Sequence, residues 1–486
     1  MKKSARMVMC CAAVAAAVNM AFGFDSPDMD WYEAKDLGLE GQIRGEEFER
    51  PYDRLPISAQ GKAPEKFFQS MGRHSTGMSC RFVPYADKVV VKWTTKDVNW
   101  LDPLMTPCAM GGVDVYGWRE DKGKWWFMAL GKGTGKGEAR EAVTHRSMEV
   151  KWTPGMPCLV NFPLRAEVKS LRIGVPKGMR IEKAAPHKTA GMPVVIYGTS
   201  LVHGCNASRP GMLFSSIASR LADVEIVNLG FSGSAKMEIG VCDVLSGIDA
   251  SLYIIDPLKN MGMDLLRERF EPFLRKLKET RSDTPIIICE DAHPEIATDK
   301  SLFVREIAAK LKAEDAAKWS NLHVLAFYAM YPGDGEETVD GVHPNDWGMM
   351  HMGKAYAATI LEILGEGRRS LGDPLVIRVL HASLSLAAGE GWLHRDGWRC
   401  EQVVLSLCLL PDEEGKGVCE MALTVSHRPY HKGPSGARPA RSSGASLART
   451  ASTRSTSSST RERTSSRAIS SDSRRRTIQS ATTTTS

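Results

Sequence analysis

The chain has 486 residues, of which 43% are hydrophobic and 25% charged, so it can form two or three folded domains and is neither fibrous nor wholly disordered. The formal net charge of +6 arises at the two ends, because residues 441–486 hold nine Arg against two acidic residues and the first six residues hold three basic ones. Residues 24–440 therefore carry a net charge of about −4, which argues against nucleic-acid binding.

Residues 1–23 have the pattern of a secretory signal peptide. Three basic residues precede an apolar run at 7–20, and small residues follow the run. The run is too short to span a bilayer, and no later segment reaches 18 consecutive apolar residues. We therefore expect a secreted or periplasmic protein without stable membrane insertion.

Residues 24–186 predict an antiparallel β-sandwich domain. From about residue 80, runs rich in β-branched and aromatic residues recur between turn signals, and no segment of helical periodicity interrupts them. The predicted strands are DKVVVKW, VDVYGW, KWWFMAL, HRSMEVKW, CLVNFPL and VKSLRIGV.

Residues 187–367 predict an α/β domain with a parallel sheet between helices. Five apolar strands alternate with amphipathic helices, the pattern of a sheet that is covered on both faces. The expected strands are 194–197, 225–229, 251–255, 285–289 and 321–327. In the first helix Leu213, Ile217 and Leu221 should share the buried face. Functional groups should gather at the carboxyl ends of the strands.

Residues 368–486 predict an irregular to disordered tail, rich in Ser, Thr and Arg. Residues 441–486 hold 15 Ser and 10 Thr, and this composition offers almost no large apolar side chain for a core. One hypothesis is an aberrant reading frame at the 3′ end. The alternative is a genuine Ser/Thr-rich linker or glycosylated stalk.

Three stretches of the α/β domain could carry chemistry. Ser200 in YGTSLVHG follows a strand, where a serine can be exposed as a nucleophile, although most such serines are caps. Gly233 in NLGFSGSAK follows the next strand and permits the close backbone approach that an oxyanion donor needs. In DGVHPND, His343 can take a proton from a serine while Asp340 orients the imidazole.

This order of blocks resembles the SGNH (GDSL-like) hydrolase family, whose domain is flavodoxin-like. The resemblance implies that Ser200 is the nucleophile, His343 the base and Asp340 its orienting carboxylate. It also implies that Gly233 and Asn260, in DPLKNM, donate hydrogen bonds to the oxyanion. The upstream GGVDVYGW is similar to the GxDLY signature of the β-sandwich that precedes this domain in one subgroup.

Two positions depart from the family pattern. Thr199 stands where the family usually has Asp before the nucleophile, which should leave the chemistry intact. The third block reads Leu-Lys-Asn-Met instead of Gly-x-Asn-Asp, so Asn228 is an alternative to Asn260, although its place within a strand favours a structural role.

The expected function is that of a secreted serine esterase acting on short-chain esters of carbohydrates, with acetyl as the preferred acyl group, without a cofactor. Its substrate would be a small-molecule or polysaccharide ester, and the sequence leaves the oligomeric state open. Four tryptophans could stack on sugar rings, although sandwich core is their ordinary role: Trp93, Trp118, Trp125 and Trp126. The alternative function is a non-catalytic carbohydrate-binding or adhesion protein with a degenerate hydrolase domain.

Further polar residues have ordinary structural interpretations. His203 could line the pocket but is more simply a satisfied or solvent-facing loop residue, and Arg209 a surface or helix-packing residue. Asp114 and Tyr116 in the GxDLY-like stretch could reach the pocket or serve the neighbouring backbone. His343 and His351 lack a third ligand at suitable spacing, so we expect no metal.

Six cysteines lie between the predicted signal peptide and residue 367: Cys80, Cys108, Cys158, Cys205, Cys242 and Cys289. They contain no CxxC pair, and they could form disulfides in an oxidising compartment or remain buried thiols.

Overall fold

The computed structural model describes residues 28–96, 103–132, 143–187, 189, 191–293, 297–331, 333, 335–365, 398–411 and 417–429. The chain forms two compact units, Met1–Arg378 and Val379–Ser486. The predicted signal peptide and the Ser/Thr-rich residues 441–486 lie outside the described residues. None of the helices described is long and apolar enough to cross a membrane.

The N-terminal half of the first unit contains two antiparallel sheets. One sheet has the order β1-β9-β4-β7, formed by Met29–Glu33, Glu167–Pro176, Lys88–Lys96 and Val143–Lys151. The other has the order β10-β3-β8-β5-β6, formed by Ile181–Lys183, Ser79–Pro84, Cys158–Asn161, Val113–Arg119 and Lys124–Gly131. The short strand β2 (Leu39–Glu40) pairs with β3.

The sandwich core follows from the alternation of side chains along its strands. Along β4, the side chains alternate between buried and half-buried, as expected for one face turned to a core. Val89, Val91 and Trp93 enter one cluster with Phe82 and Val160 from the other sheet. All six strands predicted in this region are present, and the antiparallel sandwich is confirmed.

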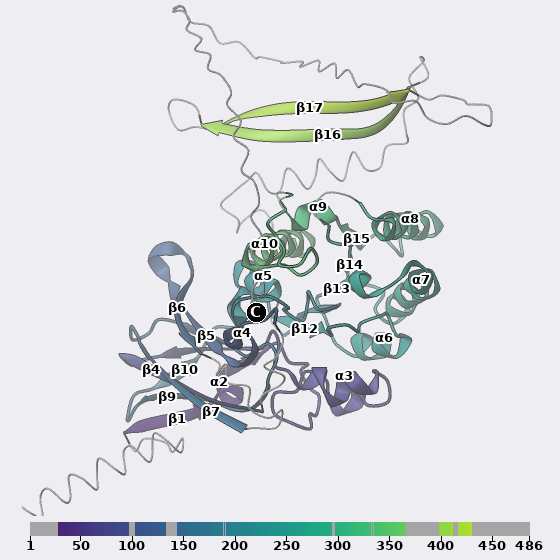
Figure 1. Cartoon of the computed structure of the whole chain (residues 1–486). Coiled ribbons are helices and arrows are strands. Elements are labelled where there is room, and N and C mark those ends of the chain that lie inside the picture. The colour runs from purple at the N-terminus through teal and green to yellow at the C-terminus, as the bar shows by residue number, and fades with distance from the viewer. Residues whose placement is uncertain are drawn as a thin grey trace, which may run out of the picture. The chain divides into compact units, whose positions relative to one another are not determined.

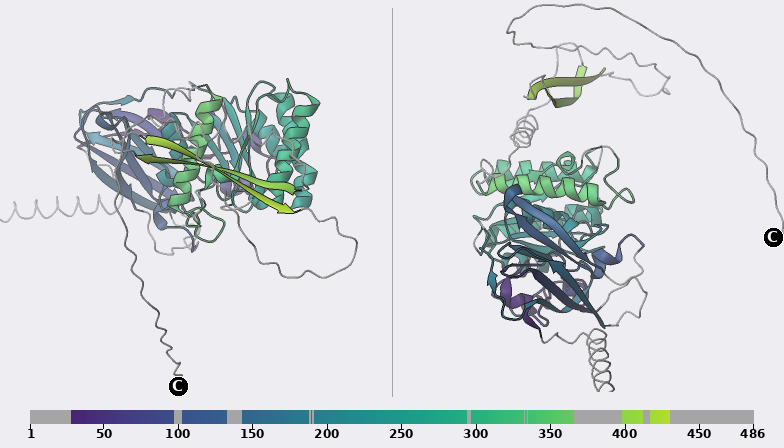
Figure 2. Two further views of the ribbon diagram at one scale, coloured as in Figure 1. Left: turned by 90° about the horizontal axis from the view of Figure 1, so that it is seen from above. Right: turned by 90° about the vertical axis from the view of Figure 1, so that its left-hand side faces the viewer.

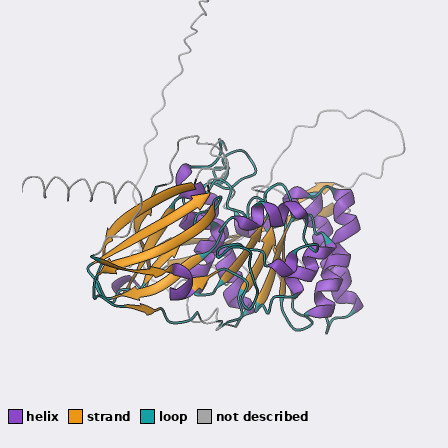
Figure 3. Ribbon diagram, turned by 90° about the horizontal axis from the view of Figure 1, so that it is seen from below, coloured by secondary structure: helices purple, strands orange, loops and turns teal. Residues whose placement is uncertain are grey.

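Short helices connect the sandwich strands and precede the second sheet: α2 (Ala34–Gly38), α3 (Glu65–Gln69), α4 (Pro107–Gly111), and the 3-10 turns Ile57–Ala59, Met71–Arg73 and Glu120–Lys122. Figure 3 shows the orange sandwich strands beside a second sheet that purple helices cover.

The second sheet is parallel and has the order β12-β11-β13-β14-β15. Its strands are Ile226–Gly230, Val194–Gly198, Leu252–Asp256, Ile286–Cys289 and Leu322–Leu325. The five strands lie within a residue or two of their predicted starts. The order 2-1-3-4-5 is flavodoxin-like, and the order in which successive strands are added to the sheet reverses between β11 and β13. The α/β fold class is therefore confirmed.

Helices cover both faces of this sheet (Figures 1 and 2). One face packs against α6 (Ile239–Ser246), α7 (Met263–Thr280) and α8 (Asp299–Glu314). The other packs against α5 (Phe214–Ala222) and α10 (Asp346–Ile363). The remaining short elements are α9 (Phe327–Met330) and the 3-10 turns Pro210–Met212 and Leu258–Asn260.

One detail of the helix prediction is wrong. Leu213 and Ile217 are buried as expected, but Leu221 is 41% exposed. The helix ends at Ala222, and Asp223 adopts a left-handed conformation directly after it. Because the helix is short, Phe214 and Ala218 complete its buried face and Leu221 lies outside it.

The second unit contains an antiparallel pair, β16 (Trp398–Pro411) and β17 (Gly417–Pro429). Residues 368–486 were expected to be irregular to disordered, and this prediction is wrong for β16 and β17. Runs such as VVLSLCLL and VCEMALTV have the apolar content of strands, which the overall composition of the segment concealed.

The six cysteines named above are free, and five of them are buried. The sequence left open whether these cysteines form disulfides or remain thiols, and in the structure they are thiols.

Candidate functional site

Ser200 lies two residues beyond the carboxyl end of β11. The chain turns back on itself there, because the N–H of His203 donates to the carbonyl of Thr199 (3.0 Å) and the N–H of Cys205 donates to that of Ser200 (3.0 Å). Thr199 is fully buried and Ser200 is 8% exposed. The turn therefore fixes the serine at the edge of the sheet where functional groups gather in α/β folds.

His343 is held in a tight loop that precedes α10. The N–H of Val339 donates to the carbonyl of His343 (2.9 Å), and a β-bridge joins Thr338 to Pro344. The side chain of Asn345 caps α10 by accepting hydrogen bonds from the N–H groups of Trp347 and Gly348. The loop thus has fixed backbone geometry at both of its ends.

The structure brings together the three residues predicted as a nucleophile, a base and an orienting carboxylate. Ser200 Oγ lies 2.8 Å from His343 Nε2, and His343 Nδ1 lies 2.8 Å from Asp340 Oδ2. These distances match the chain of hydrogen bonds that activates a serine hydroxyl.

Asp340 is positioned to remain ionised. Burial raises the pKa of its carboxyl group, but hydrogen bonds from the backbone and imidazole of His343 and from the N–H of Val342 outweigh this effect and lower the pKa to about 2. The negative charge beside Nδ1 keeps the ring proton on that nitrogen, which leaves Nε2 free to accept the proton of Ser200.

Gly233 and Asn260, the two residues predicted to bind the oxyanion, lie beyond the carboxyl ends of β12 and β13, the strands on either side of β11. Gly233 follows β12 and has φ +64°, and a Cβ at this position would meet no atom within 4 Å. Asn260 follows β13, and its side-chain N–H donates to the carbonyl of Ser234. The structure therefore places the Asn260 amide beside the turn that carries Gly233.

Asn228 has a structural position. It is fully buried, its side-chain N–H group donates to Val202 O (2.8 Å) and Ser215 Oγ (3.0 Å), and its side-chain oxygen accepts from the N–H of Gly230 (3.0 Å). These bonds tie the turn after Ser200 to β12, as the within-strand position suggested.

The GxDLY-like stretch contacts the segment that follows Ser200. Asp114 of β5 is fully buried and accepts hydrogen bonds from Arg209 Nη1 (2.7 Å), the N–H of Gly211 (2.8 Å) and Asn161 Nδ2 (2.8 Å). Tyr116 Oη accepts a further bond from Arg209 (2.5 Å). Arg209 is therefore a contact between the sandwich and the parallel-sheet region, and not a surface residue.

The same segment reaches the start of α10. Ser208 donates from its N–H (2.9 Å) and from Oγ (2.5 Å) to the carboxylate of Asp346, three residues after His343. Thr106 Oγ1, between β4 and β5, donates to Ser208 O (2.6 Å). Residues 208–211 thus connect the sandwich with the region that holds His343.

Other predicted residues take structural positions. His203 is fully buried and hydrogen-bonded, which agrees with the satisfied alternative and excludes a solvent-facing ring. Trp93 is in the sandwich core and donates to Gly111 O (2.9 Å), so it cannot stack on a ligand. Trp118 and Trp125 pack edge to face, whereas Trp126 is 42% exposed.

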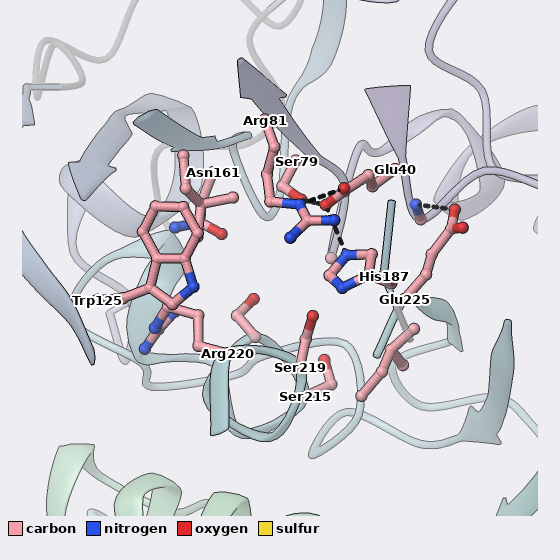
Figure 4. A pocket seen from close by; sticks show the side chains of 15 residues that line it. Glu40, Ser79, Arg81, Trp125, Asn161, His187, Ser215, Ser219, Arg220 and Glu225 are labelled. Carbon is pink, nitrogen blue, oxygen red and sulfur yellow. Dashed lines mark hydrogen bonds and ion pairs between the residues drawn. The ribbon is translucent and has the colours of Figure 1, made fainter. Parts of the chain in front are cut away.

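A small polar cavity lies between the sandwich and α5 (Figure 4). Ser200 is not among the residues that line it. Its volume of about 20 Å³ suffices for a single water molecule. At its wall His187 Nε2 lies 3.1 Å from Glu40 and His187 Nδ1 lies 3.1 Å from Asp223, while Arg81 pairs with Glu40 (2.5 Å). The cavity belongs to an ionic contact and not to the Ser200 site.

Several residues near the site carry no signal in the sequence. Arg165 donates to Ser232 Oγ (2.6 Å), next to Gly233, and His74 lies against His203. Both come from the sandwich half of the chain, and no local spacing relates them to Ser200. Among the described residues, no group of three or more His, Cys, Asp or Glu side chains could hold a metal ion.

Comparisons with known proteins agree with this arrangement. The model of the GDSL-like Lipase/Acylhydrolase family matches residues 191–361, and the GxDLY model, the N-terminus of Esterase_SGNH_hydro-type proteins, matches residues 29–181. A crystal structure from Bacteroides ovatus, assigned to the GDSL-like lipases, is 30% identical over 69% of this chain and 98% of that chain, with a TM-score of 0.59. This chain belongs to the GDSL-like lipase/acylhydrolase family.

The family membership makes this chain an SGNH-type carboxylic ester hydrolase with an N-terminal GxDLY domain. A more distant structure, the salicylyl-acyltransferase SsfX3 from a tetracycline biosynthetic pathway, shares the fold at 15% identity and a TM-score of 0.50, covering 70% of this chain and 98% of that chain. The search of curated proteins returned no match.

Proposed function

We propose that this family member is a serine esterase in which Ser200 attacks the ester carbonyl while His343 takes its proton. The observation that carries the proposal is the continuous chain from Ser200 Oγ through His343 to Asp340, with 2.8 Å at each step. Asp340 stabilises the imidazolium that forms during the attack. The attack converts the carbonyl oxygen into an oxyanion.

The oxyanion would be bound by the N–H groups of Ser200 and Gly233 and by the amide of Asn260. One of the two amide hydrogens of Asn260 is donated to Ser234 O, which holds the amide beside the Gly233 turn, and the other hydrogen is available for the oxyanion. Protonated His343 then donates to the departing alcohol oxygen, which leaves an acyl group on Ser200. Water activated by the same imidazole hydrolyses this acyl-enzyme and regenerates the serine.

We further propose a short acyl group, of acetyl size. Arg165 lies beside the turn that carries Ser200, where it contacts Cys205 Sγ and Ser232 Oγ. A long aliphatic chain would lie unfavourably against this guanidinium group, whereas an acetyl group has little apolar surface to bury.

We propose that the alcohol part of the substrate is a carbohydrate. We also propose that the protein acts on it outside the cell or in the periplasm. The imidazole of His343 and the carboxylate of Asp340 remain 22% and 30% exposed, which leaves room for a bulky alcohol. Trp347, at the start of α10, is 49% exposed close to His343 in the sequence, and an exposed indole is a suitable platform for a sugar ring. The predicted signal peptide supports the location.

The test is ester hydrolysis by the full chain and by Ser200→Ala. We expect release of acetate from p-nitrophenyl acetate and from acetylated xylan, little turnover of p-nitrophenyl palmitate, and loss of all activity in Ser200→Ala. Ser320→Ala is a suitable control, because this exposed serine lies near the amino end of β15, at the opposite edge of the sheet.

Equal turnover by wild type and Ser200→Ala would refute the nucleophile. Binding of deacetylated xylan without turnover of any ester would instead support the carbohydrate-binding alternative. Cleavage of the palmitate ester at the rate of the acetate ester would contradict the proposed acyl size and leave the mechanism in place.

A further inference from the structure

The turn that carries Gly233 is anchored from outside the hydrolase sheet. Arg165 lies between β8 and β9 of the sandwich, and its own N–H is fixed to Met110 O (3.0 Å). Its Nη2 donates to Ser232 Oγ (2.6 Å) and also contacts Cys205 Sγ. Ser232 directly precedes Gly233, and the N–H of Cys205 bonds the carbonyl of Ser200. The guanidinium group of Arg165 therefore links the turn that carries Ser200 with the turn that carries Gly233.

His203 holds the backbone of the same turn. Its Nδ1 accepts the N–H of Ser232 (3.2 Å) and lies 3.1 Å from Ser232 Oγ. An acceptor at Nδ1 requires the ring proton on Nε2, which lies 3.1 Å from Nδ1 of His74. His74 must then accept at Nδ1, so the two rings form a directed chain that ends on Ser232.

Burial and two neighbouring cations keep both rings neutral. Burial, followed by the charges of Arg165 and Arg54, holds the pKa of His74 and of His203 well below the ordinary value. A neutral ring retains the lone pair that the N–H of Ser232 needs, whereas a protonated ring would present a donor instead. Within the described residues, no carboxylate forms a hydrogen bond or ion pair with these four side chains.

Arg54 fixes the far end of this chain. Its Nε donates to His74 O (2.8 Å), and its Nη1 donates to Gly230 O (3.0 Å) at the end of β12. The guanidinium also lies 5.2 Å from the ring centroid of Phe231. His74 and Gly230 are thus held at a fixed separation by one fully buried side chain.

The Gly233 turn is closed by a backbone hydrogen bond from the N–H of Ser234 to Phe231 O (3.0 Å), and its left-handed residues need further anchors. Gly233 is left-handed, its Cα faces open space, and Ala235 and Met237 nearby also have positive φ. Left-handed conformations in residues other than glycine persist only where the surroundings impose them. The hydrogen bonds of Arg165 and His203 to Ser232 hold the residue that directly precedes Gly233.

We propose that Arg165, His203 and His74 are positioning residues that hold the Ser232–Gly233 turn in the conformation that binds the oxyanion. The GxDLY sandwich, which supplies Arg165 and His74, thereby completes the oxyanion site of the hydrolase domain. This inference rests on the proposed esterase function. It concerns the transition state and not the binding of the ester, so it predicts an effect on kcat with KM preserved.

The experiment compares two substitutions of His203 in the full chain. His203→Asn keeps an acceptor near the position of Nδ1, whereas His203→Leu removes it. Turnover of p-nitrophenyl acetate gives kcat and KM. Inhibition by an alkyl trifluoromethyl ketone, whose serine adduct carries an oxyanion, reports the oxyanion site directly.

We expect His203→Leu to lower kcat about 100-fold, the size of effect seen when one oxyanion donor is lost, with KM within about twofold of wild type. Affinity for the ketone should fall by the same factor as kcat/KM. His203→Asn should retain most of both. Arg165→Met, at a half-buried position, is a second variant that should lower kcat about tenfold if the Leu variant does not fold.

Glu225→Ala is the matched control for a general weakening of the contact between the sandwich and the hydrolase domain. Glu225 accepts the N–H of Gly41 (2.9 Å) and pairs with Arg44 (2.5 Å), but it lies at the amino end of β12, opposite to Gly230. We expect this variant to be less stable with kcat and ketone affinity unchanged.

Wild-type kcat and ketone affinity in His203→Leu, or in Arg165→Met where only that variant folds, would overturn the inference while esterase activity stands. An equal loss in His203→Asn and His203→Leu, or in Glu225→Ala, would overturn it as well, because the acceptor would not be the cause. Absence of Ser200-dependent turnover in the wild type would refute the proposed esterase itself, and the inference with it.

Discussion

The contact between Asp114 and Arg209 allows a quantitative test of how the GxDLY sandwich is joined to the hydrolase domain. Asp114 is fully buried, and the side chain of Arg209 is 18% exposed. In Asp114→Ala the guanidinium of Arg209, the N–H of Gly211 and the amide of Asn161 all lose their acceptor. Removal of one member of a buried ion pair costs about 3 to 5 kcal/mol, chiefly because the remaining charge stays buried.

Two features place the expected loss at the lower end of this range. Arg209 retains its bond to Tyr116 Oη and its partial exposure, so we expect Asp114→Ala to lower the free energy of unfolding by about 3 kcal/mol. Asp114→Asn can still accept from Arg209 and Gly211 and can donate to Asn161 after rotation of that amide. It loses only the charge, and we expect about 1 kcal/mol.

Urea-induced unfolding of the full chain, followed by tryptophan fluorescence, measures both losses as shifts of the midpoint at constant slope. Asp121→Asn is the control, because Asp121 pairs with Arg119 at the exposed end of the same strand and should leave the midpoint unchanged. A loss below about 0.5 kcal/mol in Asp114→Ala would refute the reasoning. Equal losses in the Ala and Asn variants would refute the part assigned to charge.

Three further predictions concern the backbone, the pH dependence and the orienting carboxylate. Gly233→Ala should destabilise by about 1 kcal/mol, because φ +64° is unfavourable for alanine although space for a Cβ exists; a loss above about 3 kcal/mol in urea unfolding would show a clash that the structure does not contain. Burial lowers the pKa of His187, but its hydrogen bonds to Asp223 and Glu40 outweigh this effect and raise the pKa from 6.5 to about 9. The contribution of His187 to the free energy of unfolding is therefore complete below pH 6.5 and is lost as the pH rises through 9. The difference in unfolding free energy between wild type and His187→Gln should shrink across that interval, and a constant difference would contradict the ionic contact. Asp340→Asn should lower kcat by about 10⁴-fold with little change in KM, as measured by acetate release, whereas a wild-type kcat would show that the carboxylate does not orient His343.

The contacts that could be predicted from the sequence are local or are imposed by the sheet. Ser200, Gly233 and Asn260 follow three strands that lie side by side, and parallel strands present their carboxyl ends at one edge. The spacing of Asp340 and His343 within one loop likewise allowed their contact to be predicted. Leu221 shows the limit of this approach, since helical periodicity could not show that the helix ends one residue later.

The order of strands and helices and the two-part architecture could be predicted from the sequence, because hydrophobic periodicity and turn residues act over a few neighbouring positions. The contact of Ser200 with His343, 143 residues away, was predicted from the resemblance to the SGNH family and not from periodicity. The folded structure was needed to show that His74 contacts His203, 129 residues away, and that Arg165 and Asp114 of the sandwich reach the segments around Ser200. Hydrogen bonds between distant segments leave no periodic trace, since a buried polar side chain finds its partner through the packing of whole sheets. For this reason the contacts of His203 with His74 and of Arg209 with Asp114 could not be predicted from the sequence.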